Sequence, residues 1–157
     1  MSETGSVARV RAALLAAGHA DTIAAFPAGA RTAADAAAAI GCDVAQIAKT
    51  IVFRSGDQAM VVVASGAVRV DMARAALAFG APLSRADADF VREHTRFAIG
   101  GVSPVALPAE CRVILDESLI VLDPVWAAAG SPLHVFRTTP DRLARLTGAA
   151  FSDVALR

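Results

Sequence analysis

The sequence predicts a single mixed α/β domain, with a curved and largely antiparallel sheet surrounded by helices. Three observations support this prediction. Helical and extended patterns alternate along the chain, two extended segments are joined by a tight turn, and no repeat or linker interrupts the 157 residues. A hydrophobic fraction of 55% with 19% charged residues is typical of a chain that folds around one core. We therefore treat residues 1–157 as one domain.

Helices are predicted where apolar residues recur at helical spacing or where capping residues and glycines mark the ends of a segment. These segments are residues 6–17, 32–41, 43–48, 71–79, 84–94, 126–129 and 139–148. The clearest one begins at Thr32, which with Asp35 approximates a capping box, and it ends at a glycine. Ser84 is expected to cap another helix, with Asp87 at its third position. Pro140 at the first helical position favours the last helix.

Strands are predicted where β-branched and aromatic residues cluster between turn residues. These segments are residues 22–26, 49–54, 58–65, 112–115, 119–122 and 134–137. The second and third are separated only by Ser-Gly-Asp at residues 55–57, so they are expected to form a hairpin. Residues 58–65 are apolar on both faces, which predicts a central place in a covered sheet.

Lys49 is the one lysine among 15 basic residues, and all the others are arginines. It lies at the start of the predicted strand 49–54, where alternation places it on the same face as Ile51 and Phe53. Lysine carries a compact charge whose pKa changes on desolvation, whereas arginine stays charged. Lys49 is therefore a candidate functional residue. The alternative is a lysine that extends from the strand end into solvent and has no chemical role.

Two glycine-containing segments are candidate ligand sites. Residues 100–104, Gly-Gly-Val-Ser-Pro, combine two glycines that allow close backbone approach and inward N–H groups with a stiffening Pro104. Residues 130–134, Gly-Ser-Pro-Leu-His, place Ser131 and His134 beside a tight turn. For each segment the alternative is an ordinary surface turn. The Ser-x-x-Lys, Gly-x-Ser-x-Gly and phosphate-loop motifs do not occur.

Composition and charge narrow the classes of function. A net charge of zero argues against a broad basic surface, so a nucleic-acid partner would be held over a small footprint. No apolar run is long enough to span a bilayer, and the Met-Ser-Glu start is unlike a signal peptide, so we expect a cytoplasmic protein. Cys42 and Cys111 are expected to be free thiols. The histidines are not at metal-ligand spacing, and we expect no metal site.

Taken in order, these segments resemble the YbaK/ProX family, the free-standing relatives of the editing domain inserted in bacterial prolyl-tRNA synthetases. The resemblance extends from about residue 10 to residue 154. It rests on the Gln-Ile-Ala-Lys segment that ends at Lys49 and on a second apolar strand that ends Val-Ala-Ser-Gly. The third element is the Gly-x-x-x-Pro loop at residues 100–104.

The resemblance implies a deacylase that hydrolyses the ester of a mischarged aminoacyl-tRNA, typically tRNA for proline carrying alanine or cysteine. It implies no cofactor, no metal and no covalent intermediate. The implied partners are the aminoacylated 3′ end of the tRNA and prolyl-tRNA synthetase. Lys49 would hold the terminal nucleotide and the substrate, and the backbone N–H groups of Gly100 and Gly101 would face the acyl carbonyl oxygen. Such an ester is already activated, so positioning and oxyanion stabilisation matter more than a strong nucleophile.

In this interpretation the attacking group is a water molecule, helped by the neighbouring ribose hydroxyl. The further residues expected to bind substrate are Ser103, Pro104, Ser131, His134 and Phe26. Phe26, together with Ile23, is a candidate wall of the acyl pocket. Two alternatives stay open at this point. One is a module that binds an acceptor end or a small ligand without turnover, and the other is a hydrolase that uses Ser103 as its nucleophile.

Overall fold

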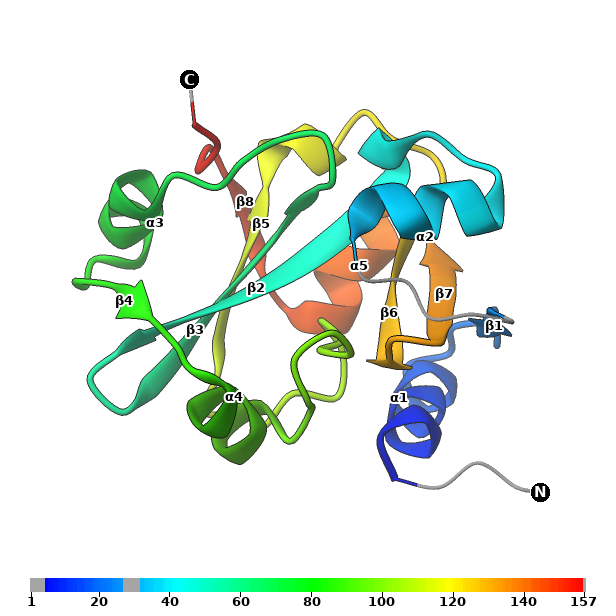
Figure 1. Cartoon of the computed structure of the whole chain (residues 1–157), viewed down its shortest axis with the longest axis horizontal. Helices are drawn as coiled ribbons and strands as arrows, with labels where there is room; N and C mark the ends of the chain where they lie inside the picture. Colours follow the sequence, from blue (N-terminus) through cyan, green and yellow to red (C-terminus); the bar gives the residue numbers. More distant parts are fainter. Residues whose placement is uncertain (1–4, 27–31, 157) are drawn as a thin grey trace.

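The computed structural model describes residues 5–26 and 32–156, which form one mixed sheet flanked by helices (Figure 1). The strand order is β1-β7-β6-β2-β3-β5-β8, with β4 paired to β2. The strands are β1 (Ala24–Ala25), β2 (Ile47–Ser55), β3 (Gln58–Ser65), β4 (Ser84–Arg85), β5 (Arg112–Asp116), β6 (Val125–Ser131), β7 (His134–Thr138) and β8 (Ala150–Ser152). The helices are α1 (Gly5–Ala16), α2 (Ala33–Ile40), α3 (Met72–Phe79), α4 (Ala88–Thr95) and α5 (Pro140–Thr147), with single 3-10 turns at Val44–Gln46 and Glu117–Leu119.

The sheet combines antiparallel and parallel pairings, which confirms the predicted fold class. β2 and β3 form the expected hairpin and run across the middle of the sheet (Figure 1). The pairs β1–β7, β6–β7 and β2–β4 are also antiparallel, whereas β2–β6, β3–β5 and β5–β8 are parallel. The parallel contact of β2 with β6 places Ile47 beside Trp126 and Ala48 beside Ala127. This pairing brings the Lys49 segment close to the β6–β7 turn.

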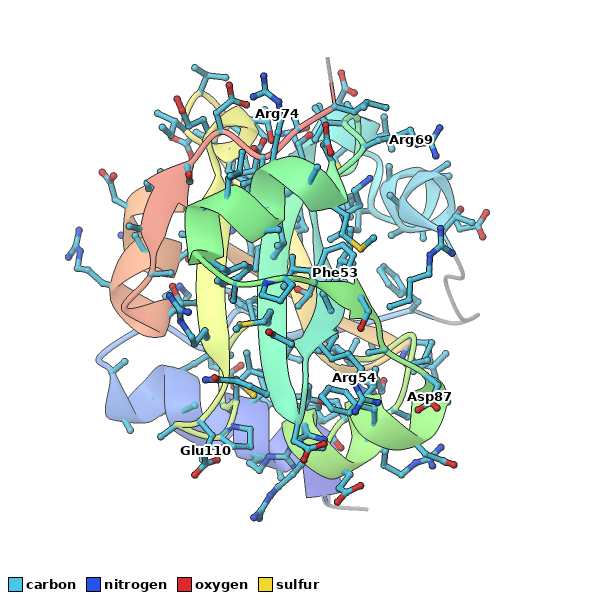
Figure 2. The ribbon with its side chains drawn as sticks, turned by 90° about the vertical axis from the view of Figure 1, so that its left-hand side faces the viewer. Phe53, Arg54, Arg69, Arg74, Asp87 and Glu110 are labelled. Carbon is cyan, nitrogen blue, oxygen red and sulfur yellow. The ribbon has the colours of Figure 1, made fainter. Side chains whose placement is uncertain are left out.

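The two faces of the sheet are covered by different helices. One buried cluster joins the strands to α1, α4 and α5 through Val10, Val91 and Leu143. On the other face, Phe53 of β2 packs against Phe79 of α3. Figure 2 shows α3 crossing this face above β2 and β3. Seven of the eight β3 residues are buried, so β3 lies at the apolar centre of the molecule, as the sequence predicted.

Helix ends follow the capping rules of the sequence at several points. Thr32 accepts a hydrogen bond from the Asp35 amide at 3.1 Å, and Gly41 ends α2 in the left-handed conformation. Asp71 caps α3. Thr139 caps α5 ahead of its proline. These contacts satisfy amide groups that a helix start leaves unpaired, so local chemistry alone determines where these helices begin.

The prediction for residues 84–94 is wrong at its first residues. Ser84 does not cap a helix, because Ser84 and Arg85 pair with Arg54 and Phe53 as strand β4. Asp87 caps α4 instead, and its carboxylate accepts the Phe90 N–H at 2.8 Å. Both residues are good caps, and pairing with β2 decides between them.

Two further predictions are wrong and one strand was missed. Residues 126–129 form the centre of β6 instead of a helical turn, because pairing with β2 and β7 overrides the helix preference of alanine. Residues 119–122 do not form a strand, because a 3-10 turn at Glu117–Leu119 ends the extended segment. β8 was not predicted, since three residues carry too little pattern to recognise.

Candidate active site

A cavity of about 430 Å³ lies between α2, β2, the β6–β7 turn and the segment at residues 99–102, which includes the start of the glycine loop. Its lining includes five residues that the sequence singled out, namely Phe26, Lys49, Gly100, Ser131 and His134. The rest of the wall is mostly apolar and comes from α2, β2, β6 and β7. An apolar hollow with a few polar groups is the usual form of a small-molecule site.

Lys49 is the third residue of β2, not the first, because the strand begins at Ile47. Its side chain is half-buried, and its Nζ donates a hydrogen bond to the backbone oxygen of Val68. Burial lowers the pKa of Lys49, and the positive charge of Arg69 lowers it further. No carboxylate pairs with Lys49 within residues 5–26 and 32–156. The ammonium group thus lies beside the cavity with no counter-ion among the described residues.

A second hollow of about 400 Å³ adjoins the cavity and shares Lys49 with it. Arg69 and Arg85 also line this hollow, which we call the basic groove. Neither arginine forms an ion pair in the part of the chain that the structure describes. Figure 2 shows Arg69 at the upper right of the view, near α2. Three cations therefore line the basic groove beside the cavity, which favours a negatively charged ligand there.

Gly100 and Gly101 have different roles in the glycine loop. Gly100 is exposed at the cavity with φ of 94°, and its N–H has no partner among the described residues. Gly101 is buried, and its N–H donates to the backbone oxygen of Ala98 at 3.0 Å. The expectation that both amides face a ligand is therefore corrected: in this conformation the free donor of the pair is Gly100. The N–H of Gly101 instead closes the turn that shapes the loop.

Ser131 and His134 form a hydrogen-bonded pair on the β6–β7 side of the cavity. Ser131 Oγ lies 2.7 Å from His134 Nδ1 and accepts the Leu133 N–H at 3.0 Å. Because the Leu133 amide donates to Ser131 Oγ, the Ser131 hydroxyl can donate its own proton to His134 Nδ1. In that arrangement a neutral His134 imidazole carries its proton on Nε2. The pair therefore supplies polar groups to one part of the otherwise mostly apolar cavity wall.

Ser103 and Pro104 do not line the cavity. Ser103 is 0% exposed, and its Oγ accepts the Val105 N–H at 3.3 Å in a local turn. Pro104 is buried next to it. A hydroxyl in this place cannot reach a substrate, so the geometry argues against a hydrolase with Ser103 as nucleophile. Ile23 packs against the main core, and of the two predicted pocket-wall residues only Phe26 lines the cavity.

Thr50 is a cavity residue that the sequence reasoning missed. It follows Lys49 on β2, and its Oγ1 is buried without a hydrogen-bond partner in the described residues. A buried hydroxyl without a partner costs about 1–3 kcal/mol. Threonine is common in strands, so no sequence signal marked it. Trp126 was missed because the prediction placed it in a helical turn instead of on the cavity wall.

Within residues 5–26 and 32–156, no group of three or more potential metal ligands comes together. Cys42 and Cys111 are separate free thiols, and burial is the main cause that raises the pKa of each. A search of the same residues for a helix with the length and hydropathy of a membrane span finds none.

Residues 27–146, which contain the β2–β3 hairpin, Lys49 and the glycine loop, match the family model of the aminoacyl-tRNA editing domain. The chain belongs to this family, as the resemblance implied.

The most informative relatives are similar over most of their length. One is the uncharacterized protein YwhH of Bacillus subtilis (strain 168), 33% identical over 123 residues that cover 78% of each protein. A solved structure described as a candidate trans-editing enzyme for prolyl tRNA synthetase matches with a TM-score of 0.92 and 41% identity, over 99% of this chain and 100% of that chain. The structure of the hypothetical protein APE2540 matches with a TM-score of 0.87 and 29% identity, over 94% and 99% of the two chains.

Proposed function

We propose that this protein is a trans-editing deacylase that hydrolyses the ester between a small amino acid, alanine or cysteine, and tRNA for proline. Membership of the editing family supports the reaction class, and the similarity to a candidate trans-editing enzyme for prolyl tRNA synthetase supports the choice of tRNA. One observation carries the proposal: Lys49, Gly100 and the Ser131–His134 pair line the same cavity. Prolyl-tRNA synthetase is the proposed source of the substrate, and the cytoplasm is the proposed site of action.

The tRNA would be gripped at its 3′ end only. Lys49 lies between the cavity and the basic groove, where Arg69 and Arg85 add two further positive charges. Phosphate groups next to the terminal nucleotide would bind there, since phosphate contacts position a nucleic acid without reading its sequence. Such a small footprint suits a chain with zero net charge.

The acyl group would enter the cavity toward the apolar wall formed by Phe26, Ala36 and Trp126. Its carbonyl oxygen would then accept a hydrogen bond from the Gly100 N–H. One well-placed donor of this kind stabilises a developing oxyanion by about 2.7–4 kcal/mol. Water adds to the carbonyl carbon, the bond to the ribose oxygen breaks, and that oxygen takes up a proton. The neighbouring ribose hydroxyl assists this step, so no nucleophile from the protein is needed.

Selection between amino acids would depend on cavity volume. The difference of one methylene group is worth about 1–3 kcal/mol in an apolar pocket, so acyl groups of similar size are separated incompletely. Ser131 supplies a hydroxyl group to polar substituents near the acyl carbon.

The decisive experiment follows ester loss from alanyl-, cysteinyl- and prolyl-tRNA for proline with the wild-type protein and Lys49→Met. Rapid loss of the alanyl or cysteinyl ester, slow loss of the prolyl ester and dependence on Lys49 are expected. Tight binding of the tRNA without ester loss would favour the alternative, a non-catalytic binding module. Equal rates for all three esters would contradict selection by the cavity.

A further inference from the structure

The first turn of α1 supports the cavity although it does not line it. Gly130, near the end of β6 with φ of 98°, approaches this turn very closely. A Cβ added at Gly130 would lie 2.7 Å from both the carbonyl carbon and the oxygen of Ser6, and 3.0 Å from the Val7 nitrogen. These are main-chain atoms, so no side chain can rotate away to make room.

Gly101 makes the same kind of close backbone contact with Gly130 and its neighbour Ser131. A Cβ at Gly101 would lie 2.7 Å from the Ser131 Cα and 3.1 Å from the Gly130 carbonyl carbon. The register of β6 against β7 shifts at this point, between Ala128 and Ser131. Gly130–Ser131 is thus in close backbone contact with two other segments, the first turn of α1 and Gly101.

Arg9 connects α1 to the start of the same loop. Its Nη2 donates to the backbone oxygen of Arg96 at 2.8 Å, and its guanidinium carbon lies 4.4 Å from the Phe97 ring centroid. Its Nε is buried without a partner among the described residues. Burial, and then the charge of Arg96, lower the pKa of Arg9. A buried donor without a partner is unfavourable for folding. Arg9 is nevertheless held in this place, where its other contacts fix Arg96 and Phe97 before the glycine loop.

We infer that Gly130 and Arg9 are positioning residues through which α1 sets the location of the Gly100 N–H at the cavity. The catalytic consequence rests on the proposed function, whereas the location of the loop rests on these contacts alone. A side chain at Gly130 has to separate β6 from α1 or push Ser131 toward Gly101. A misplacement of about 1 Å at a reacting centre reduces the rate by up to about 10²-fold.

The test compares Gly130→Ala with Gly148→Ala. Gly148 also has a positive φ, 66°, but no atom lies within 4 Å of an added Cβ. Both variants therefore carry backbone strain, and only Gly130→Ala adds the clash. We expect Gly130→Ala to lower kcat for alanyl-tRNA by about 10-fold or more with KM nearly unchanged, and to move the amide resonances of Gly100 and Gly101. Gly148→Ala should change neither.

Arg9→Met and Arg9→Lys test the second contact and do not depend on whether Gly130→Ala folds. Arg9→Met should lower kcat and shift the Gly100 amide resonance. The melting temperature should change little, because removal of the unpartnered Nε offsets loss of the bond to the Arg96 oxygen. Arg9→Lys keeps a donor for the Arg96 oxygen and should recover part of kcat. Unchanged kcat and unchanged Gly100 resonances in Gly130→Ala and Arg9→Met would overturn the inference. If the wild-type protein hydrolyses no ester, the proposed function fails, and the resonances of Gly100 and Gly101 still decide whether α1 positions the loop.

Discussion

Replacing Lys49 with methionine separates the chemistry of the site from its packing. Methionine keeps an unbranched, flexible side chain of similar length and removes the charge. The lost interactions are the hydrogen bond from Nζ to the Val68 oxygen and the proposed contact with the 3′ end of the tRNA. The first affects stability and the second affects the reaction, so the two effects can be measured independently.

The structure gives these effects different sizes. A hydrogen bond that involves a charged group is worth about 1.5–3 kcal/mol, which corresponds to a loss of about 10- to 150-fold in kcat/KM. For folding, the loss of the bond to the half-buried Val68 is opposed by relief of the partly buried ammonium. These contributions have opposite signs, so the free energy of unfolding should change by about 1 kcal/mol or less.

The pH dependence of stability provides a further check on Lys49. Its pKa is lowered in the folded protein, so between that value and its ordinary value the unfolded chain binds more protons. The free energy of unfolding therefore rises with pH across this interval, and Lys49→Met should lack that rise. Urea unfolding of both proteins at several pH values measures the difference. The activity due to Lys49 should fall as the pH rises through its lowered pKa, since the ammonium is lost.

Arg54→Met is the matched control, because Arg54 is also a cation on β2 but does not line the cavity. It should keep kcat/KM for alanyl-tRNA within about twofold, which corresponds to about 0.4 kcal/mol. The reasoning is refuted if Lys49→Met deacylates at the wild-type rate. It is also refuted if the loss of activity in Lys49→Met only follows a loss of folded protein.

Three other substitutions test the remaining parts of the site. Ala36→Val reduces the volume of the cavity next to α2 and should lower kcat/KM for cysteinyl-tRNA more than for alanyl-tRNA. The expected difference is about 1–3 kcal/mol per added methylene equivalent, and parallel deacylation assays measure it. Gly101→Ala places a Cβ 2.7 Å from the Ser131 Cα and should destabilise the fold by about 1–3 kcal/mol in urea unfolding. Ser131→Ala leaves His134 Nδ1 without its 2.7 Å partner and should lower kcat about 2- to 12-fold in the same deacylation assays.

The sequence by itself determined the features that depend on near neighbours. Thr32, Asp71 and Thr139 cap helices because each side chain reaches amide groups two or three residues away. The β2–β3 hairpin follows from two apolar runs and a short turn, and Lys49 lies on the face with Ile51 that alternation predicts. One cavity is lined by Lys49, Gly100, Ser131 and His134, which were selected for their chemistry, and by Phe26, which was selected through the family resemblance.

Only the tertiary structure decided which of several reasonable local options was used. Residues 126–129 are extended because β2 and β7 offer hydrogen bonds on both sides, and these partners are far away in the sequence. Ser103 is buried and Thr50 lines the cavity for the same reason: packing between distant segments selects which polar groups a ligand can meet. The choice between Gly100 and Gly101 as the free donor depends on one turn bond to Ala98 and on the contact with Ser131. Such selections arise from contacts between distant segments, and spacing along the chain does not encode them.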